Sequence, residues 1–357
     1  MRSRLLTAAL AAAVFAAPAS AQLMIPDSGA GDRIMLFSKA DGALLDLDWI
    51  TDLSGEFVFT TPKEAIVVNG EIWVSDQVVD AIHRFDRSTR QFLGSITAMS
   101  NGSNLDNVRG MGFDGTTVYI TNAAPTANRG IQMYSTDGTP TGFLPIPSSL
   151  FDVEPFGAEL LIANEGVNAI QRWTPDGTLL GNFATGVVFP QQVATMADGS
   201  ILAVSSIASA GVEGVYHFNA DGSLRAFIDT EVMKVQFGEH VPRGAWLLDD
   251  GGYLITTDRG VFKAMEIAPG TFVFLSIVSG VNAQFIGELT TDEEGCLADY
   301  NVDGQVNSND ISAFLSAWLD SVQNGNLIAD FNLDGTVNSN DISAFLSMWL
   351  SAVQGGC

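Results

Sequence analysis

The chain has 357 residues, with 41 Asp and Glu side chains against 16 Lys and Arg, so its formal net charge at pH 7 is −25. A surface this acidic repels nucleic acid and anionic membranes, and both are excluded as expected partners.

The first 21 residues have the pattern of a secretory signal peptide. Arg2 and Arg4 precede an apolar run over 5–17, and Ala19, Ser20 and Ala21 follow as a small-residue cleavage site. That run is too short to span a bilayer, and no later stretch reaches about 20 apolar residues. We therefore expect a mature protein that begins near Gln22, has no membrane span, and is extracellular or bound at the cell surface.

Residues 22–291 contain short β-rich runs separated by Gly, Asp, Asn and Pro, without a long helical pattern. A strand with an aromatic residue in its fifth place recurs at a spacing of roughly 39–49 residues, the size of a four-stranded propeller blade. The aromatic positions are Phe37, Phe85, Tyr134, Trp173 and Phe218, and a divergent sixth copy covers 260–265. The spacing predicts an all-β fold, a six-bladed β-propeller.

A closed ring needs every blade to be complete, because open blades leave unpaired sheet edges. The first repeat lacks an innermost strand before Leu23, whereas one extra strand, 285–289, follows the last complete repeat. We expect this last strand to complete the first blade, three of whose strands come from the N-terminal end.

The segment 62–86 resembles an NHL-type repeat: it has Pro62, an inner strand, a Gly turn, a strand that ends in Asp76, and an Ile-x-x-Phe strand. This resemblance supports a propeller fold and says little about function. The propeller's ligand stays open, with a glycan, a peptide and a small molecule as alternatives.

Candidate chemistry in the propeller is sparse. His83 and His217 fall within aligned third strands and are expected to pack, and His240 precedes an inner strand. A metal-dependent lactonase site would need residues such as Glu64, Asn107, Asp152 and Asn282, near the starts of four inner strands. The same residue types are ordinary turn formers. Without a nucleophile elbow or a Cys–His pair, we assign no catalytic residue.

Near its end the chain contains a duplicated loop, which begins at Asp299 and again at Asp330. Oxygen-bearing residues occupy the positions that a calcium loop requires, and Gly304 and Gly335 occupy the sharp-turn position. The pattern predicts two Ca²⁺ ions, although Asx-rich turns are the alternative. The expected ligands are Asp299, Asn301, Asp303, Gln305, Asn307 and Asp310 in the first loop, and Asp330, Asn332, Asp334, Thr336, Asn338 and Asp341 in the second.

Each loop ends in Asp rather than Glu and lacks an entering helix, so residues 296–357 differ from a two-helix EF-hand and resemble a dockerin. The Gly-Cys pairs at 295–296 and 356–357 match the bacterial subgroup called GC-type dockerins. The resemblance implies docking to a cohesin-like protein or another cell-envelope receptor. By motif match the partner-binding residues are Ser308, Asn309, Ser339 and Asn340, although Ser308 and Asn309 could instead cap the following helix.

Cys296 and Cys357 are the only cysteines and flank this segment. In an exported protein we expect them to form a disulfide, with two free thiols as the alternative.

The helix after each loop carries an apolar stripe. The first comprises Ile311, Phe314, Leu315, Trp318 and Leu319, and the second Ile342, Phe345, Leu346, Trp349 and Leu350. We expect the stripes to face each other as a small core, with a partner-binding face as the alternative.

These observations predict an exported calcium-binding protein whose dockerin-like segment docks a propeller recognition domain. The alternative is a propeller hydrolase, a lactonase or a polysaccharide-degrading enzyme, because dockerins often carry enzymes that degrade polysaccharides.

Overall fold

The computed structural model describes residues 21–29, 31–124, 126–206, 212–238, 240–289, 298, 300–301, 306–325, 329, 331–332 and 336–355. Residues 1–20 of the predicted signal peptide and both cysteines lie outside this part of the chain. The chain forms two compact units, Met1–Leu289 and Thr290–Cys357. None of the helices in the described part combines the length and apolarity needed to cross a membrane.

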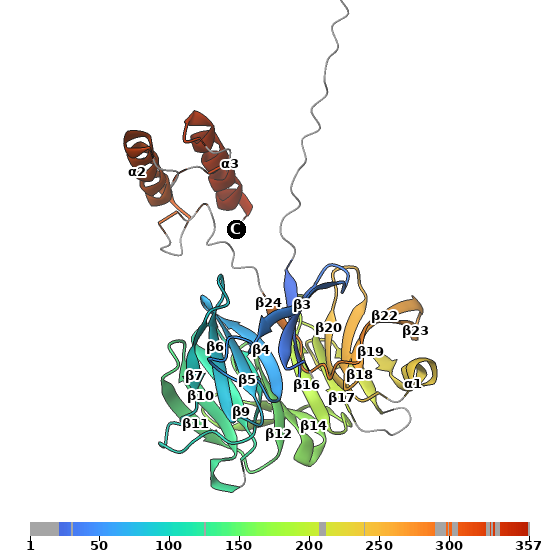
Figure 1. Ribbon diagram of the computed structural model, residues 1–357. Coiled ribbons are helices and arrows are strands. Elements are labelled where there is room, and N and C mark those ends of the chain that lie inside the picture. The colour runs from blue at the N-terminus through green and yellow to red at the C-terminus, as the bar shows by residue number, and fades with distance from the viewer. Residues whose placement is uncertain are drawn as a thin grey trace, which may run out of the picture. The chain divides into compact units, whose positions relative to one another are not determined.

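The N-terminal unit is a six-bladed β-propeller with four antiparallel strands in every blade (Figure 1). The first three blades, from inner to outer strand, are β24 (Gly287–Leu289), β1 (Gln22–Asp27), β2 (Arg33–Ser38) and β3 (Leu44–Thr51); β4 (Pro62–Val68), β5 (Glu71–Asp76), β6 (Ala81–Asp86) and β7 (Phe92–Ile96); and β8 (Val108–Phe113), β9 (Thr117–Asn122), β10 (Gly130–Ser135) and β11 (Pro140–Pro145).

The other three blades follow the same order. They are β12 (Leu150–Phe156), β13 (Glu159–Asn164), β14 (Ala169–Trp173) and β15 (Leu179–Thr185); β16 (Pro190–Thr195), β17 (Ile201–Ser205), β18 (Gly214–Phe218) and β19 (Leu224–Asp229); and β20 (Pro242–Leu247), β21 (Tyr253–Thr257), β22 (Gly260–Ala268) and β23 (Thr271–Ser279). The predicted six-bladed propeller is confirmed. A short helix, α1 (Glu231–Phe237), joins the fifth blade to the sixth.

The ring closes as the strand count predicts. Strand β24 pairs antiparallel with β1, so that Gln22 lies opposite Leu289 and Met24 opposite Gly287. Phe285 and Ile286, just before β24, are fully buried. The first blade therefore takes three strands from the start of the unit and its innermost strand from the end.

The recurring aromatic residues pack between neighbouring blades. Phe37, Phe85 and Tyr134 are each completely buried near the ends of β2, β6 and β10. Phe37 belongs to a cluster that includes Leu254 of the sixth blade. Tyr134 packs among residues of the second blade and donates a hydrogen bond to the Ala98 carbonyl, 2.9 Å away. The repeat in the sequence is thus a repeat of inter-blade contacts.

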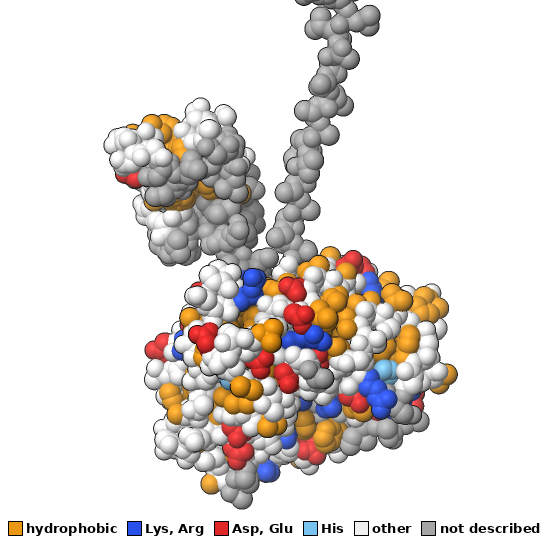
Figure 2. Space-filling view, in the orientation of Figure 1, with side chains coloured by type: hydrophobic (Ala, Val, Ile, Leu, Met, Phe, Trp, Pro, Cys, Tyr) orange, Lys and Arg blue, Asp and Glu red, His pale blue; other side chains and the backbone are white. Residues whose placement is uncertain are grey.

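The Asp-Gly pairs form the hairpin turns after the third strands. The Asp41 carboxylate accepts a hydrogen bond from the Ala43 N–H, and Asp137 accepts one from Thr139 in the same way. The glycines that follow these aspartates have φ of +76° at Gly42 and +88° at Gly138, a region that favours glycine. Figure 2 shows Asp and Glu side chains scattered over the visible face of this unit, not gathered in one patch.

The C-terminal unit contains two helices of 17 residues each, α2 (Ser308–Asn324) and α3 (Ser339–Gly355). Their core is aromatic: the rings of Phe314 and Phe345 stack with centroids 4.3 Å apart and are fully buried. Tyr300 and Phe331, which precede the two helices, add edge-on contacts with this pair. Both helices and both approaching segments therefore meet at one small core.

Candidate functional site

Each helix of the C-terminal unit begins with an Asn–Asp pair that holds the preceding loop. Asn307 is the N-cap of α2, and its side-chain oxygen accepts a hydrogen bond from the Asn309 N–H at 2.8 Å. Asp310 completes a capping box by accepting the Asn307 N–H at 2.8 Å. In α3, Asn338 accepts the Asn340 N–H at 2.8 Å, and Asp341 accepts the Asn338 N–H at 2.7 Å.

The carboxylates of Asp310 and Asp341 also reach the early part of each loop. Asp310 accepts a hydrogen bond from the Asn301 N–H at 3.2 Å, and Asp341 accepts one from the Asn332 N–H at 3.2 Å. Both aspartates are fully buried. Each therefore links the third and the ninth positions of its predicted calcium loop, as a residue that organises the loop must.

Two tryptophans connect each helix to the loop of the other copy through hydrogen bonds. Trp318 of α2 donates its indole N–H to the Asn338 carbonyl at 2.9 Å, and Trp349 of α3 donates to the Asn307 carbonyl at 3.0 Å. Each helix thus holds the ninth position of the other loop. This exchange gives the unit an internal two-fold arrangement that follows the duplication in the sequence.

The structure describes seven of the twelve predicted calcium ligands, which are Asn301, Asn307, Asp310, Asn332, Thr336, Asn338 and Asp341. The remaining five, Asp299, Asp303, Gln305, Asp330 and Asp334, lie outside the described residues, as do Cys296 and Cys357. All seven side chains offer oxygen atoms, the donors that Ca²⁺ prefers. The donor chemistry at the ends of both loops therefore fits calcium.

The four predicted partner-binding residues lie at equivalent places. Ser308 and Asn309 are the first two residues of α2, and Ser339 and Asn340 are the first two of α3. All four are exposed. The cap of α2 is Asn307, so Ser308 and Asn309 are not the residues whose side chains cap this helix.

The expected core role of the apolar stripes is only partly correct. Phe314 and Phe345 are buried, but Leu315 is 41% and Leu319 is 52% exposed. In α3, Leu346 is 39% and Leu350 is 52% exposed. Two helices and two short loops cannot cover a stripe as wide as the one in the sequence, so these leucines form an exposed apolar ridge on each helix.

The three histidines of the propeller have structural contacts. His217 is buried between the Ser200 and Tyr253 hydroxyls, at 2.8 and 2.9 Å, and burial lowers its pKa. His83 contacts the Ser95 hydroxyl at 2.9 Å, and His240 contacts the Phe237 carbonyl at 3.0 Å. Packing, the expected role of His83 and His217, agrees with these contacts.

The four residues considered for a lactonase-like metal site have other partners. Glu64 accepts the Met111 N–H at 2.5 Å, and Asp152 accepts the Val193 N–H at 2.9 Å, so both join neighbouring blades. Asn107 accepts from the Gln77 amide at 2.7 Å, and Asn282 accepts from the Gln284 amide at 3.0 Å. Burial raises the pKa of both Glu64 and Asp152, and the charge of Asp152 raises the pKa of Glu64 further. Across the described residues, no three His, Cys, Asp or Glu side chains are grouped so as to hold a metal.

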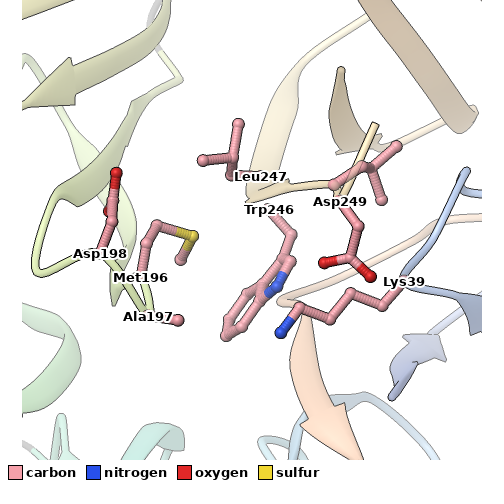
Figure 3. A pocket seen from close by; sticks show the side chains of 8 residues that line it. Lys39, Met196, Ala197, Asp198, Trp246, Leu247 and Asp249 are labelled. Carbon is pink, nitrogen blue, oxygen red and sulfur yellow. The ribbon is translucent and has the colours of Figure 1, made fainter. Parts of the chain in front are cut away.

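Two surface pockets lie at opposite ends of the inner strands. A pocket of about 230 Å³ lies where β16 and β20 end, and in Figure 3 its Lys39 and Trp246 side chains point toward one another. A larger pocket of about 490 Å³ lies beside the segments that lead into β20 and β24, and its lining includes His240, Asp258 and Asn282. The second pocket is at the end of the propeller where the inner strands begin.

Comparisons with known proteins separate the two units. Residues 297–345 match the model of the dockerin type I domain. A comparison with curated proteins found no match. Among solved structures, that of a nidogen/laminin complex matches at a TM-score of 0.53 and 13% identity, covering 75% of this chain and 98% of that one.

A protein of unknown function from Bacteroides caccae matches at a TM-score of 0.51 and 13% identity, with the same coverage of 75% and 98%. The periplasmic gluconolactonase of Pseudomonas aeruginosa matches at 0.46 and 15% identity, covering 71% and 81%. At these identities the similarity concerns the fold, and none of the three assigns an activity. The resemblance to NHL repeats stays a prediction.

Dockerin domains bind calcium, dock to cohesins and occur in extracellular or cell-surface proteins. Because residues 297–345 match the family model, the chain contains a C-terminal dockerin type I domain, and a six-bladed β-propeller precedes it.

Proposed function

We propose that this protein is exported and that its dockerin unit, loaded with two calcium ions, attaches the propeller as a recognition domain to a cohesin-type partner at the cell surface. The observation that carries the proposal is the repeated surface at the start of α2 and α3. Each copy combines an exposed Ser-Asn pair with exposed leucines about two and three turns further along the helix.

The chemistry of this surface suits a protein partner. Leu315 and Leu319 offer apolar area that the small unit does not bury, and Ser308 and Asn309 offer hydrogen-bonding groups beside it. Leu346, Leu350, Ser339 and Asn340 repeat the set on α3. Because the two copies are equivalent, a partner can bind either one, in orientations related by a half turn.

Calcium has a definite role in this surface. The carboxylates of Asp310 and Asp341 hold the loops next to the exposed Ser-Asn pairs, and both are proposed calcium ligands. The ion would fix the direction in which each helix begins, and its binding free energy would add to the folding free energy of the unit. We expect docking to require calcium for this reason.

The test is capture by the full-length protein from the cell-envelope fraction, followed by identification of the captured protein. The wild type should retain a cohesin-containing protein in calcium and release it in chelator. Replacing Ser308, Asn309, Ser339 and Asn340 together by Arg should abolish capture and leave the melting temperature unchanged, because all four side chains are exposed.

The matched controls are the two double variants, Ser308→Arg with Asn309→Arg, and Ser339→Arg with Asn340→Arg. Each leaves one copy of the surface intact and should still capture the partner. Undiminished capture by the quadruple variant, or capture of proteins without a cohesin, would remove this surface from the docking site.

A further inference from the structure

In five of the six blades the inner strand carries an extra residue near its start, and in the first blade the extra residue lies just before the inner strand β24. In the second blade, Pro62 pairs with Asp76 and Glu64 with Ser75, so Lys63 is the additional residue of a β-bulge. The register shifts at the same place in the other blades. Bulges redirect side chains and are over-represented next to functional sites. The residues at this place, here called the bulge ring, are Lys63, Arg109, Phe151, Gln191, Arg243 and Gln284.

Members of the bulge ring contact one another between blades. The Lys63 ammonium lies 2.6 Å from the Gln284 side-chain oxygen, and the Arg109 guanidinium lies 4.0 Å from the centre of the Phe151 ring. The charges of Arg243 and Arg109 are also close enough to lower the pKa of Lys63. The sixth, second and third blades therefore direct their cations toward a common region at one end of the inner strands.

These cations have no direct counter-ion among the residues that the structure describes. In the part of the chain that the structure describes, no carboxylate forms an ion pair with Lys63, Arg109 or Arg243. Asp258 and Glu165 act on Arg243 and Arg109 only at longer range. Lys63 is 3% exposed, and burial is the main cause of its lowered pKa. Arg109 and Arg243 are half-buried, but burying the Lys63 cation without an anion is costly, so its position requires an explanation.

A second observation points to the same region. Gln191 is completely buried, yet neither its amide nitrogen nor its amide oxygen has a hydrogen-bond partner in the described part of the propeller. The buried Nε–H of Arg243, in the next blade, also has none. Buried polar groups in native proteins nearly always have partners, and the exceptions mark bound ions or ligands. Here the unsatisfied groups include donors, as an anion requires.

The 490 Å³ pocket adjoins the bulge ring. Asn282 lines the pocket and accepts a hydrogen bond from Gln284 of the ring at 3.0 Å. Asp258, also in the pocket wall, is the carboxylate that acts on Arg243. A ligand of a few hundred Å³ could therefore place a charged group at the ring and its uncharged remainder in the pocket.

We propose that the bulge ring binds the anionic group of a small organic ligand, a carboxylate or a phosphate ester, with the rest of the ligand in the adjoining pocket. Lys63 and Arg243 supply the charge, Arg109 adds a guanidinium held on the Phe151 ring, and the Gln191 amide donates a hydrogen bond. This assignment gives the ligand class for the recognition role proposed above. The proposed ligand site uses only residues of the propeller. A negative result in the ligand titration would therefore not contradict docking by the C-terminal unit, and failed docking would not contradict the ligand site.

The experiment is isothermal titration calorimetry of the full-length protein with three sugars that share one ring: glucuronate, glucose 6-phosphate and glucose. At least one of the two anionic sugars should bind, and glucose should not. Glucuronate binding identifies a carboxylate site, and glucose 6-phosphate binding identifies a phosphate site. If neither anion binds at ~10 mM, the proposal is wrong, since three convergent cations should exceed that affinity.

Two variants locate the site. Arg243→Gln should weaken binding about tenfold or more, the effect of losing one charge-assisted hydrogen bond. Gln191→Glu keeps the size of the side chain but adds a negative charge, and it should abolish binding. Unfolding curves for both variants show whether the propeller remains folded.

The control is Arg225→Gln, because Arg225 is 49% exposed and pairs with Asp198 in a turn at the other end of the fifth blade. This variant should bind like the wild type. Wild-type affinity in folded Arg243→Gln and Gln191→Glu would overturn the proposal, as would equal binding of glucose and the anions.

Discussion

Closure of the propeller depends on one glycine, and Gly287→Ala should open it. A Cβ atom at Gly287 of β24 would lie 1.8 Å from the Ala65 carbonyl oxygen and 3.1 Å from its carbonyl carbon. Carbon and oxygen normally stay more than 3 Å apart, and the obstructing atom belongs to the backbone of β4, which cannot rotate away. The added methyl group therefore has to push β24 out of its place between β1 and β4.

The cost follows from what β24 holds in place. Overpacking a rigid site costs about 1–3 kcal/mol even when the fold adapts. If β24 leaves the blade, the buried side chains of Phe285 and Ile286 become exposed, at about 1.5–3 kcal/mol each. We therefore expect a loss of about 3–6 kcal/mol in unfolding free energy, and a melting temperature lower by about 6 °C or more.

Thermal and urea unfolding of the full-length protein measures this loss. The matched control is Gly70→Ala in the turn between β4 and β5, where an added Cβ meets nothing within 4 Å. Gly70→Ala should unfold like the wild type. If the unfolding free energy of Gly287→Ala is also within about 1 kcal/mol of the wild-type value, then β24 does not hold the propeller closed and the reasoning is wrong.

Three further predictions concern the metal, the loop ties and pH. Chelating calcium in the reduced full-length protein should lower the helical circular dichroism signal, and added calcium should restore it, because unscreened carboxylates in the loops repel one another; an unchanged signal would contradict a folding role for the ion. Trp318→Phe removes the indole bond to the Asn338 carbonyl and should weaken calcium binding about fivefold, measured by titration, because such a bond contributes about 1 kcal/mol. Burial raises the pKa of Glu154 to about 7, so the folded state holds this proton above the usual carboxyl range, and stability should fall as pH rises from about 4.5 through about 7. Glu154→Gln should flatten that pH dependence, and an identical profile would show that another group causes it.

Much of the fold could be predicted because it depends on local spacing. The aromatic positions from Phe37 to Phe218 recur since each fills the same inter-blade contact, and the missing inner strand before Leu23 has to be supplied from elsewhere. Both calcium loops are equally local, since the position of Asp310 relative to Asn307 and Asn301 is fixed by the sequence between them.

Features that depend on distant partners were not predictable. Leu315 and Leu319 follow the same helical spacing as Phe314, and only the small size of the unit decides that they are exposed. The bulge ring was missed because a bulge is a property of two paired strands. The one signal in the sequence is weak: Lys63, Gln191 and Arg243 each directly follow a proline at the start of an inner strand.

The pairing of β24 with β1 also determines when the first blade can be completed during folding. The strand that completes the first blade is the last of the propeller to be synthesised, so the hydrogen-bonding edge of β1 must wait for almost the whole unit. Until then that edge can pair with other chains, and contacts between residues so far apart in sequence form slowly. A chain that stops anywhere before β24 keeps an open edge permanently, so premature truncation should produce aggregation and not a smaller working domain.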